Sequence, residues 1–475
     1  EAELKSVAEE LKQKLFAWSV TDGITNTADG QRLKNEDPQE MLAALENIPE
    51  NSLILLRDFH LFLDTPGPLL TRLVKDAMRL GKTKGKRLVV VGCRVVLPPE
   101  LEREFVVGEF GLPGKQDIGV ILDNIAKSAR RKKPDGETRE KLLDAACGLT
   151  SMEAENAFAL SLVQRGELAP DIVSGEKAMA VKKSGMLEVC SASETLDNIG
   201  GLGLLKDWLI KRKDAFGKRA MEYRLPSPKG LLIIGIPGTG KSLTAKATAR
   251  VFERPLLRLD AGRLYGGLVG ESEANARNVI KTVEAIAPCV LWLDEIEKGF
   301  AGSRSSGMTD GGTSSRVFGT FLSWMQDKTA PVFIVATAND VTQLPPEMLR
   351  KGRFDELFFV DLPNAEERLA IWRIQIAKYG RKPEAFMIEG LVKASEGFTG
   401  SEIEQAFIEA LYLAFNQGKE PGDDTVLEAL ANSVPLGKLM GEHINTLRNW
   451  AKGRARPATA SKEDPGERRM VVGLN

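Results

Sequence analysis

The sequence predicts an α/β protein of two tandem modules, each a parallel sheet flanked by helices and followed by a small helical lid. Short apolar runs ending in polar residues alternate with helical patterns, which is typical of buried parallel strands. A glycine-rich turn joins one such run to a helix at residues 230–251. The elements also occur twice, because the Leu-Pro-Pro-Glu at residues 97–100 returns at residues 344–347.

The composition is that of an ordinary soluble globular protein. The chain has 475 residues, of which 43% are hydrophobic and 28% charged, with a net charge of -1. This balance gives no global electrostatic reason to expect a nucleic-acid partner. No apolar run reaches the roughly 18 residues of a membrane span, so we expect no membrane span. The expected location is cytoplasmic.

Few side chains could hold a transition metal. The only histidines are His60 and His443, and no pair of cysteines has CxxC spacing. A zinc site or a disulfide framework is therefore not expected, which fits a reducing compartment. The four cysteines are Cys93, Cys147, Cys190 and Cys289.

Residues 235–242, GIPGTGKS, form the most informative segment. An apolar strand precedes it and a helix pattern follows, which is the context that a phosphate-binding loop requires. Its backbone N–H groups and the helix N-terminus would face the phosphates. We expect Lys241 to reach the β- and γ-phosphates of ATP and Ser242 to bind Mg²⁺. The other expected nucleotide-binding residues of this segment are Pro237, Gly238, Thr239, Gly240 and Leu243.

A second apolar run ends in two acids, Asp294 and Glu295, 53 residues after Lys241. A buried parallel strand would deliver both carboxylates to the carboxyl edge of the sheet. We expect Asp294 to hold Mg²⁺ through water and Glu295 to activate the attacking water. Taken alone, a strand ending in two acids is often a surface cap, but the preceding phosphate loop favours the catalytic interpretation.

Three further polar residues follow. Asn339 ends another buried-strand pattern and could bind the water or the γ-phosphate, or else cap a turn. Arg350 and Arg353 are three residues apart and would share a face on one helix. Their permanently charged guanidinium groups suit the charge that develops on a γ-phosphate, although solvated surface arginines are the alternative.

These motifs, in this order, resemble the AAA clade of the AAA+ ATPases. Residues 196–202 (LDNIGGL), 270–273 (GESE) and 397–403 (GFTGSEI) complete the resemblance. It implies that Ile199 and Gly200 contact adenine, that Asn339 is a sensor, and that Gly400 begins the lid helix near the adenosine. It also implies that Arg350 and Arg353 act on the ATP of a neighbouring subunit in a ring, expected to be hexameric.

Two longer segments narrow the resemblance to one family within this clade: DEIEKGFAG and LPPEMLRKGRFDELFFVDLPN. They are similar to a little-characterised AAA family of cyanobacteria, other bacteria and red-algal plastids, which is associated in cyanobacteria with inorganic-carbon use. This resemblance implies a location in the plastid stroma if the gene is plastid-encoded. One departure concerns protein threading. Relatives that thread proteins carry an aromatic residue where this chain has Leu268, and Tyr265 lies just upstream. Glu297, where an Asp is usual, is expected to matter less than Asp294 or Glu295.

The first copy lacks the catalytic groups. Its strand at residues 53–59 carries Arg-Asp-Phe where two carboxylates are needed, and Cys93-Arg94 replaces Ala338-Asn339. No phosphate loop precedes residue 16. The loop was lost, or an upstream segment carries it. We therefore predict a first module that does not hydrolyse ATP.

The predicted boundaries follow the motifs. Residues 1–168 form the degenerate module, with its α/β part to about residue 125 and its lid from residue 126. A linker covers 169–195. The active α/β domain covers 196–363, its lid 364–450, and a flexible tail 451–475.

We predict an ATP-hydrolysing ring motor that remodels a protein partner, with ATP and Mg²⁺ as cofactors and an unidentified protein substrate or adaptor. The alternative is an ATP-switched scaffold or regulator. A nucleic-acid remodeller is a third, weaker hypothesis, motivated by basic clusters at residues 82–87, 130–133 and 448–456. These clusters are more typical of solvated loops, so nucleic acid is not the expected partner.

Overall fold

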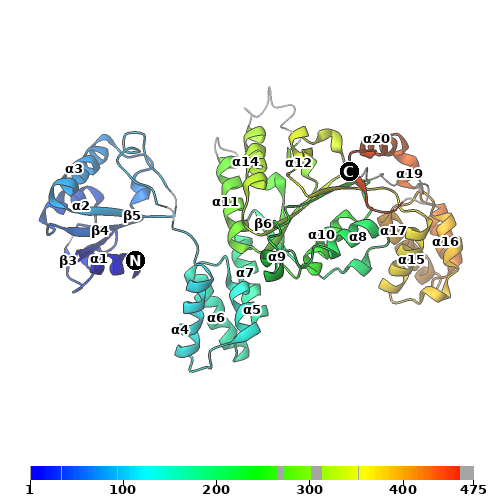
Figure 1. Cartoon of the computed structure of the whole chain (residues 1–475), viewed down its shortest axis with the longest axis horizontal. Coiled ribbons are helices and arrows are strands. Elements are labelled where there is room, and N and C mark those ends of the chain that lie inside the picture. Colours follow the sequence, from blue (N-terminus) through cyan, green and yellow to red (C-terminus); the bar gives the residue numbers. More distant parts are fainter. Residues whose placement is uncertain are drawn as a thin grey trace, which may run out of the picture. The chain divides into compact units, whose positions relative to one another are not determined.

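The computed structural model divides the chain into two compact units, Glu1–Gly111 and Leu112–Asn475 (Figure 1). The α/β class predicted from the sequence is confirmed, because both units contain largely parallel sheets packed against helices. The structure describes residues 2–33, 35–93, 95–108, 110–183, 185–191, 193–264, 271–300, 313–350 and 352–460.

The first unit contains a sheet of order β3-β2-β1-β4-β5. Strands β1 (Lys14–Ser19), β4 (Ser52–Arg57) and β5 (Arg87–Val91) are parallel. Strands β2 (Gly23–Asn26) and β3 (Arg32–Leu33) extend the sheet in antiparallel fashion. The helices are α1 (Ala2–Glu10), α2 (Pro38–Ala44) and α3 (Pro68–Lys84).

Alternation along β1 and β4 fills both faces of this sheet. Phe16, Trp18 and Ile54 pack in one core with residues of α2 and α3. Leu15 and Leu53 pack on the opposite face, where Ala8 of α1 covers them. The two-residue period of a strand explains this division, because successive side chains point to opposite faces.

The second unit begins with four helices, α4 (Lys115–Ser128), α5 (Gly136–Ala146), α6 (Ser151–Arg165) and α7 (Pro170–Lys183). A capping box fixes the start of α6, since Thr150 and Glu153 exchange hydrogen bonds with each other's backbone N–H groups. Helix α7 lies inside the segment expected to be a linker. The helices share a core that includes Leu122, Leu142 and Phe158.

The larger sheet has the order β12-β11-β7-β10-β9-β8-β6. Strands β7 (Gly230–Gly235), β9 (Cys289–Leu293) and β10 (Val332–Ala338) are buried throughout, as expected of parallel strands covered on both faces. Strands β8 (Leu256–Leu259) and β11 (Glu356–Val360) flank them in parallel, and β12 (Arg456–Pro457) pairs in parallel with β11. At the far edge, β6 (Leu187–Cys190) runs antiparallel to β8.

Helices cover both faces of this sheet (Figure 1). On one face, α11 (Glu271–Ile286) and α14 (Thr313–Asp327) pack against apolar residues such as Leu291 and Ile334. On the other, α8 (Gly203–Ile210) and α10 (Lys241–Val251) pack against residues such as Ile233 and Phe333. Two short helices, α9 (Lys218–Glu222) and α12 (Ile296–Phe300), complete this part.

A helical lid follows the sheet. Its main helices, α15 (Ala365–Lys378) and α17 (Gly400–Asn416), both begin with a capping box, from Asn364 and from Thr399. The lid core includes Trp372 and Phe407. The remaining helices are α16 (Ile388–Ala394), α18 (Asp423–Ala431), α19 (Leu436–Leu439) and α20 (Gly441–Ala451), and Leu447 of α20 packs in the core of the larger sheet.

The predicted flexible tail is wrong for residues 451–460. Strand β12 pairs with β11, and Ala458 behind it is buried. Two arginines of the basic cluster at residues 448–456 have partners within the chain: Arg448 binds Asp361 through two nitrogens at 2.7 and 2.9 Å, and Arg456 lies 3.6 Å from Glu356. The polar composition of the segment suggested that it is solvated, because composition alone does not reveal specific ion pairs or strand pairing.

Strands β1, β4 and β5 of the first unit repeat the order and parallel direction of β8, β9 and β10. Asp58 and Glu295, which follow the middle strand of each set, share a left-handed conformation with φ of 53° and 46°. The sequence alignment had matched Cys93 and Arg94 with Ala338 and Asn339. The strand register corrects this by one residue, because it matches Cys93 with Asn339. Within the described residues of the first unit, no strand corresponds to β7.

Candidate active site

The loop between β7 and α10 has the geometry of an anion cradle. Gly238 and Gly240 have φ of 77° and 93°, a region that residues with a side chain rarely adopt. A Cβ at Gly238 would also overlap the hydroxyls of Ser401 and Thr399 in the lid. Glycine is therefore required both by the turn and by the close approach of α17.

Lys241 begins α10 and is almost completely buried. Its Nζ donates to the carbonyl oxygens of Gly235, at 2.8 Å, and Ile236, at 2.7 Å. Burial lowers the pKa of Lys241 to about 8, against the opposing effect of three nearby carboxylates. The ammonium group is thus held inside the loop by two neutral carbonyl groups, where an anionic phosphate would add a counter-charge in direct contact.

The two acids predicted at the end of β9 lie in the same cavity. Asp294 accepts hydrogen bonds from the Thr337 hydroxyl at 2.9 Å and from Arg258 at 3.0 Å. Glu295 accepts one from the Asn339 amide at 3.0 Å and pairs with Lys298 at 2.7 Å. Both carboxylates are therefore oriented by neighbours on β8, β10 and the start of α12.

Asn339 is fixed at the end of β10 by an additional acid. Its backbone N–H donates to Glu297 at 2.9 Å. Burial raises the pKa of the Glu297 carboxyl. Glu297, which sequence reasoning ranked below its neighbours, thus anchors the strand end that carries the expected sensor residue.

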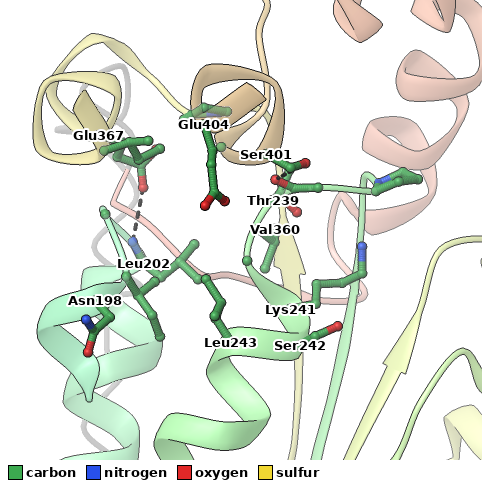
Figure 2. A pocket seen from close by; sticks show the side chains of 18 of the residues that line it. Asn198, Leu202, Thr239, Lys241, Ser242, Leu243, Val360, Glu367, Ser401 and Glu404 are labelled. Carbon is green, nitrogen blue, oxygen red and sulfur yellow. Dashed lines mark hydrogen bonds between the residues drawn. The ribbon is translucent and has the colours of Figure 1, made fainter. Parts of the chain in front are cut away.

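These groups line a cavity of about 490 Å³ between the sheet edge and the lid. Figure 2 shows Lys241 and Ser242 on the loop side, with Ser401 and Glu404 facing them from α17. The cavity brings together every predicted nucleotide-binding residue and all the predicted catalytic residues except the arginines. They are Ile199, Gly200, Pro237, Gly238, Thr239, Gly240, Lys241, Ser242, Leu243, Asp294, Glu295, Asn339 and Gly400.

Arg350 and Arg353 do not lie on one helix. A short 3-10 helix, Pro346–Leu349, ends before Arg350, whose backbone is extended. Arg350 is exposed, and neither arginine is among the described residues that line the cavity. The Nε of Arg353 is buried and has no hydrogen-bond partner in the described part of the chain. The predicted shared helical face is wrong, because Gly352, with φ of 96°, turns the chain between them.

Sequence reasoning missed several residues that hold the site together. Thr337 joins the two acids, since its hydroxyl donates to Asp294 and accepts the Glu295 N–H at 3.1 Å. Glu367 of α15 accepts the Leu202 N–H at 3.1 Å, which ties the lid to the loop that carries Ile199 and Gly200 (Figure 2). The sequence pattern could have indicated Glu367, because it is the third residue of a capping box. Nothing in the sequence pattern indicated Thr337 or Arg258.

The donor set suits Mg²⁺ better than a transition metal. Ser242 and Asp294 supply one hydroxyl and one carboxylate to the cavity. Magnesium usually takes one or two such ligands, with water and substrate phosphates completing the shell. Among the described residues there is no group of three or more His, Cys, Asp or Glu side chains that could hold a metal ion alone.

Comparisons with known proteins agree with this geometry. Residues 231–362 match the model of the ATPase family associated with various cellular activities (AAA). An uncharacterised AAA domain-containing protein ycf46 from Trieres chinensis is 39% identical over 467 residues, covering 96% of this chain and 93% of the relative. The chain belongs to the AAA ATPase family. The family resemblance inferred from the motifs is confirmed.

Other comparisons match the amino-terminal part of this AAA ATPase and further relatives. Residues 1–110 and 116–184 match the N-terminal and second domains of SpoVK-like AAA ATPases. The ycf46 protein of Pyropia yezoensis is 39% identical over 454 residues, 94% of this chain and 91% of the relative. A cell division cycle protein 48 homologue of Archaeoglobus fulgidus is 27% identical over 357 residues, covering 68% of this chain and 47% of that protein. No helix in the described ranges is long and apolar enough to cross a membrane.

Proposed function

We propose that this AAA ATPase hydrolyses ATP with Mg²⁺ in the cavity beneath its lid. The observation that carries the proposal is the convergence of a phosphate loop, two oriented carboxylates and an amide in one cavity of about 490 Å³. This volume lies within the range of small-molecule sites. The polar groups gather at the sheet edge, and Gly200, expected to contact adenine, lies against Ile371 of the lid helix α15.

Each side chain has a distinct task in this proposal. Lys241 and the loop N–H groups bind the phosphates. Glu295, held by the Asn339 amide, accepts a proton from the attacking water. Ser242 and Asp294 hold Mg²⁺, which neutralises phosphate charge.

We further propose that the chain assembles into a ring of copies, expected to be hexameric, in which Arg350 and Arg353 complete the neighbouring site. Arg350 is exposed, and the Nε of Arg353 has no hydrogen-bond partner in the described ranges. Neither arginine lines the cavity of its own chain. A guanidinium supplied from another subunit stabilises the charge that develops on the transferred phosphoryl group. Turnover per subunit should therefore rise with protein concentration.

Glu295→Gln tests the hydrolysis proposal. Because the amide keeps the shape but not the basicity of the carboxylate, ATP binding should persist while turnover falls by about a hundredfold or more. Glu389→Gln, an exposed change on α16, is the matched control. Equal turnover in the Glu295→Gln variant and the wild type would rule out Glu295 as the base.

The work done with the ATP is proposed to be remodelling of a protein partner, and an ATP-switched scaffold is the alternative. The pore positions Tyr265 and Leu268, on which threading would depend, lie outside the described residues. The two functions differ in their need for hydrolysis. A motor should leave a co-purified partner unaltered in the Glu295→Gln variant and alter it in the wild type, whereas a scaffold should release it on nucleotide exchange alone.

A further inference from the structure

A second cavity, of about 570 Å³, lies at the opposite end of the larger sheet from the ATP site. Helices α5 and α7 form one wall. The turns before β8 and β9 form the other, through residues 253–255 and residues 286 and 288. The cavity therefore separates the four-helix segment from the amino ends of two strands whose carboxyl ends lead to the ATP site.

The inner wall of this cavity carries buried positive charge. Lys177 of α7 is only 7% exposed, and its ammonium group makes one long hydrogen bond, 3.4 Å, to the carbonyl of Asp144. Burial lowers the pKa of Lys177. The Nε of Arg254 is also buried, without a hydrogen-bond partner in the described ranges.

One carboxylate, that of Asp144, faces these cations, and other cations already compete for it. It forms an ion pair with Lys115 and lies 4.0 Å from a terminal nitrogen of Arg254. Two cationic side chains thus share the inner wall with one acid, which lies against Lys115 and whose Oδ1 has no hydrogen-bond partner in the described ranges. A buried charge without a counter-ion is costly, so this arrangement favours the entry of an anion.

The remaining charges of the cavity lie at its rim. Glu137, Glu140, Lys141 and Glu253 are exposed to solvent, and Lys141 pairs with Glu137 at 2.6 Å. Solvation screens such charges, so they repel an anion at the inner wall only weakly. Between rim and inner wall the lining is apolar, with Val181 on α7 and with Val189, Leu257 and Ile286 on the side of the sheet, where Val189 and Leu257 are paired.

We propose that this cavity binds a small organic anion, a carboxylate or phosphate carried on an apolar body. The anionic group lies against Lys177 and Arg254, and the apolar body fills the space beside Val189 and Leu257. The site is separate from the ATP cavity and shares no lining residue with it. It bridges the helical segment and the ATPase sheet, so that a bound anion holds the two together.

Phenyl phosphate is a suitable probe, because it combines a phosphate with an apolar ring. Calorimetric titration would use the full chain carrying Lys241→Ala, which removes the main phosphate-binding cation of the ATP site. We expect one saturable site per chain, and about tenfold or more weaker binding with Lys177→Met or Arg254→Gln, since each removes a charged hydrogen-bond donor. Lys182→Met changes an exposed lysine on the same helix and should leave the affinity unchanged.

Phenol, of similar shape but neutral, is the control for the probe and should bind much more weakly. Thermal unfolding checks that both cavity variants fold; Lys177→Met should not lower the midpoint of the free chain, because it removes a poorly paired buried charge. The proposal is overturned if phenyl phosphate shows no saturable binding up to about 10 mM. It is equally overturned if phenol binds as well, or if Lys177→Met and Arg254→Gln bind the probe as tightly as their parent.

Discussion

At the scale of single residues, the site depends on side chains that orient the catalytic groups. Thr337 is the clearest case, because one hydroxyl donates to Asp294 and accepts from the backbone of Glu295. Without it, the carboxylate expected to hold Mg²⁺ and the carboxylate expected to activate water lose their common support.

Thr337→Val therefore tests whether this support matters for catalysis. Valine keeps the shape but removes a hydrogen bond to a charged group, which is worth on the order of 1.5–3 kcal/mol. We expect turnover to fall roughly tenfold while ATP affinity changes little. Steady-state ATPase rates and nucleotide titration measure the two effects. Thr446→Val, an exposed change on α20, serves as the control, and a wild-type rate in Thr337→Val would argue against the orienting role.

Lys328 provides a pH test of stability. Burial lowers its pKa from 10.5 to about 8 in the fold. Between these values the unfolded chain binds more protons than the folded chain, so this residue destabilises the fold below pH 8 and the penalty disappears as the pH rises.

The free energy of unfolding of Lys328→Met, relative to that of the wild type, should thus be higher at pH 7 than at pH 10, by on the order of 1–3 kcal/mol. The lost hydrogen bond to the Val332 carbonyl adds an offset that does not depend on pH. Denaturant unfolding at both pH values measures the difference. A stability difference that stays constant with pH would contradict the assigned pKa.

At the scale of elements, the edge strand β6 and its neighbour β8 connect the helical segment to the ATP site. Strand β6 pairs with β8 so that Glu188 lies opposite Arg258. Arg258 lies 3.8 Å from Glu188 and 3.0 Å from Asp294. A strand that follows the helical segment therefore contacts, through one arginine, the carboxylate expected to hold Mg²⁺.

Arg258→Gln should consequently change the Mg²⁺ requirement. A cation 3.0 Å from Asp294 competes with a divalent ion for the same carboxylate. We expect the Mg²⁺ concentration for half-maximal ATP binding to fall about threefold or more, as followed with a fluorescent nucleotide. Arg373→Gln on α15 is a control distant from Asp294 in sequence. A higher Mg²⁺ requirement in Arg258→Gln would mean that the arginine assists the metal site.

At the scale of the whole molecule, the sequence was most informative where chemistry restricts residue types. The phosphate loop and the acids after β9 were predictable because few other residues can bind phosphate or activate water at that spacing. Thr337, Arg258 and Glu367 were not predictable, because their roles arise from pairing between strands and from lid contacts distant in sequence. The ordered β12 was missed for the same reason.

The repeat of the sheet order also explains what the first unit lacks. The position of Asp294 is occupied there by Arg57, and that of Asn339 by Cys93. A cation in place of the metal carboxylate disfavours Mg²⁺. The prediction that this unit does not hydrolyse ATP stays a prediction, and it implies one active site per chain.

The most direct test of the central claim, that hydrolysis is completed across subunits, is a mixing experiment. One variant, Lys241→Ala, keeps its arginines but has a defective phosphate loop. The other, Arg350→Ala with Arg353→Ala, keeps an intact cavity but cannot act on a neighbour. Each alone should be nearly inactive, and equal mixtures should recover a substantial fraction of wild-type turnover. Mixtures no more active than the sum of the two variants, or full activity of the arginine variant alone, would contradict the account.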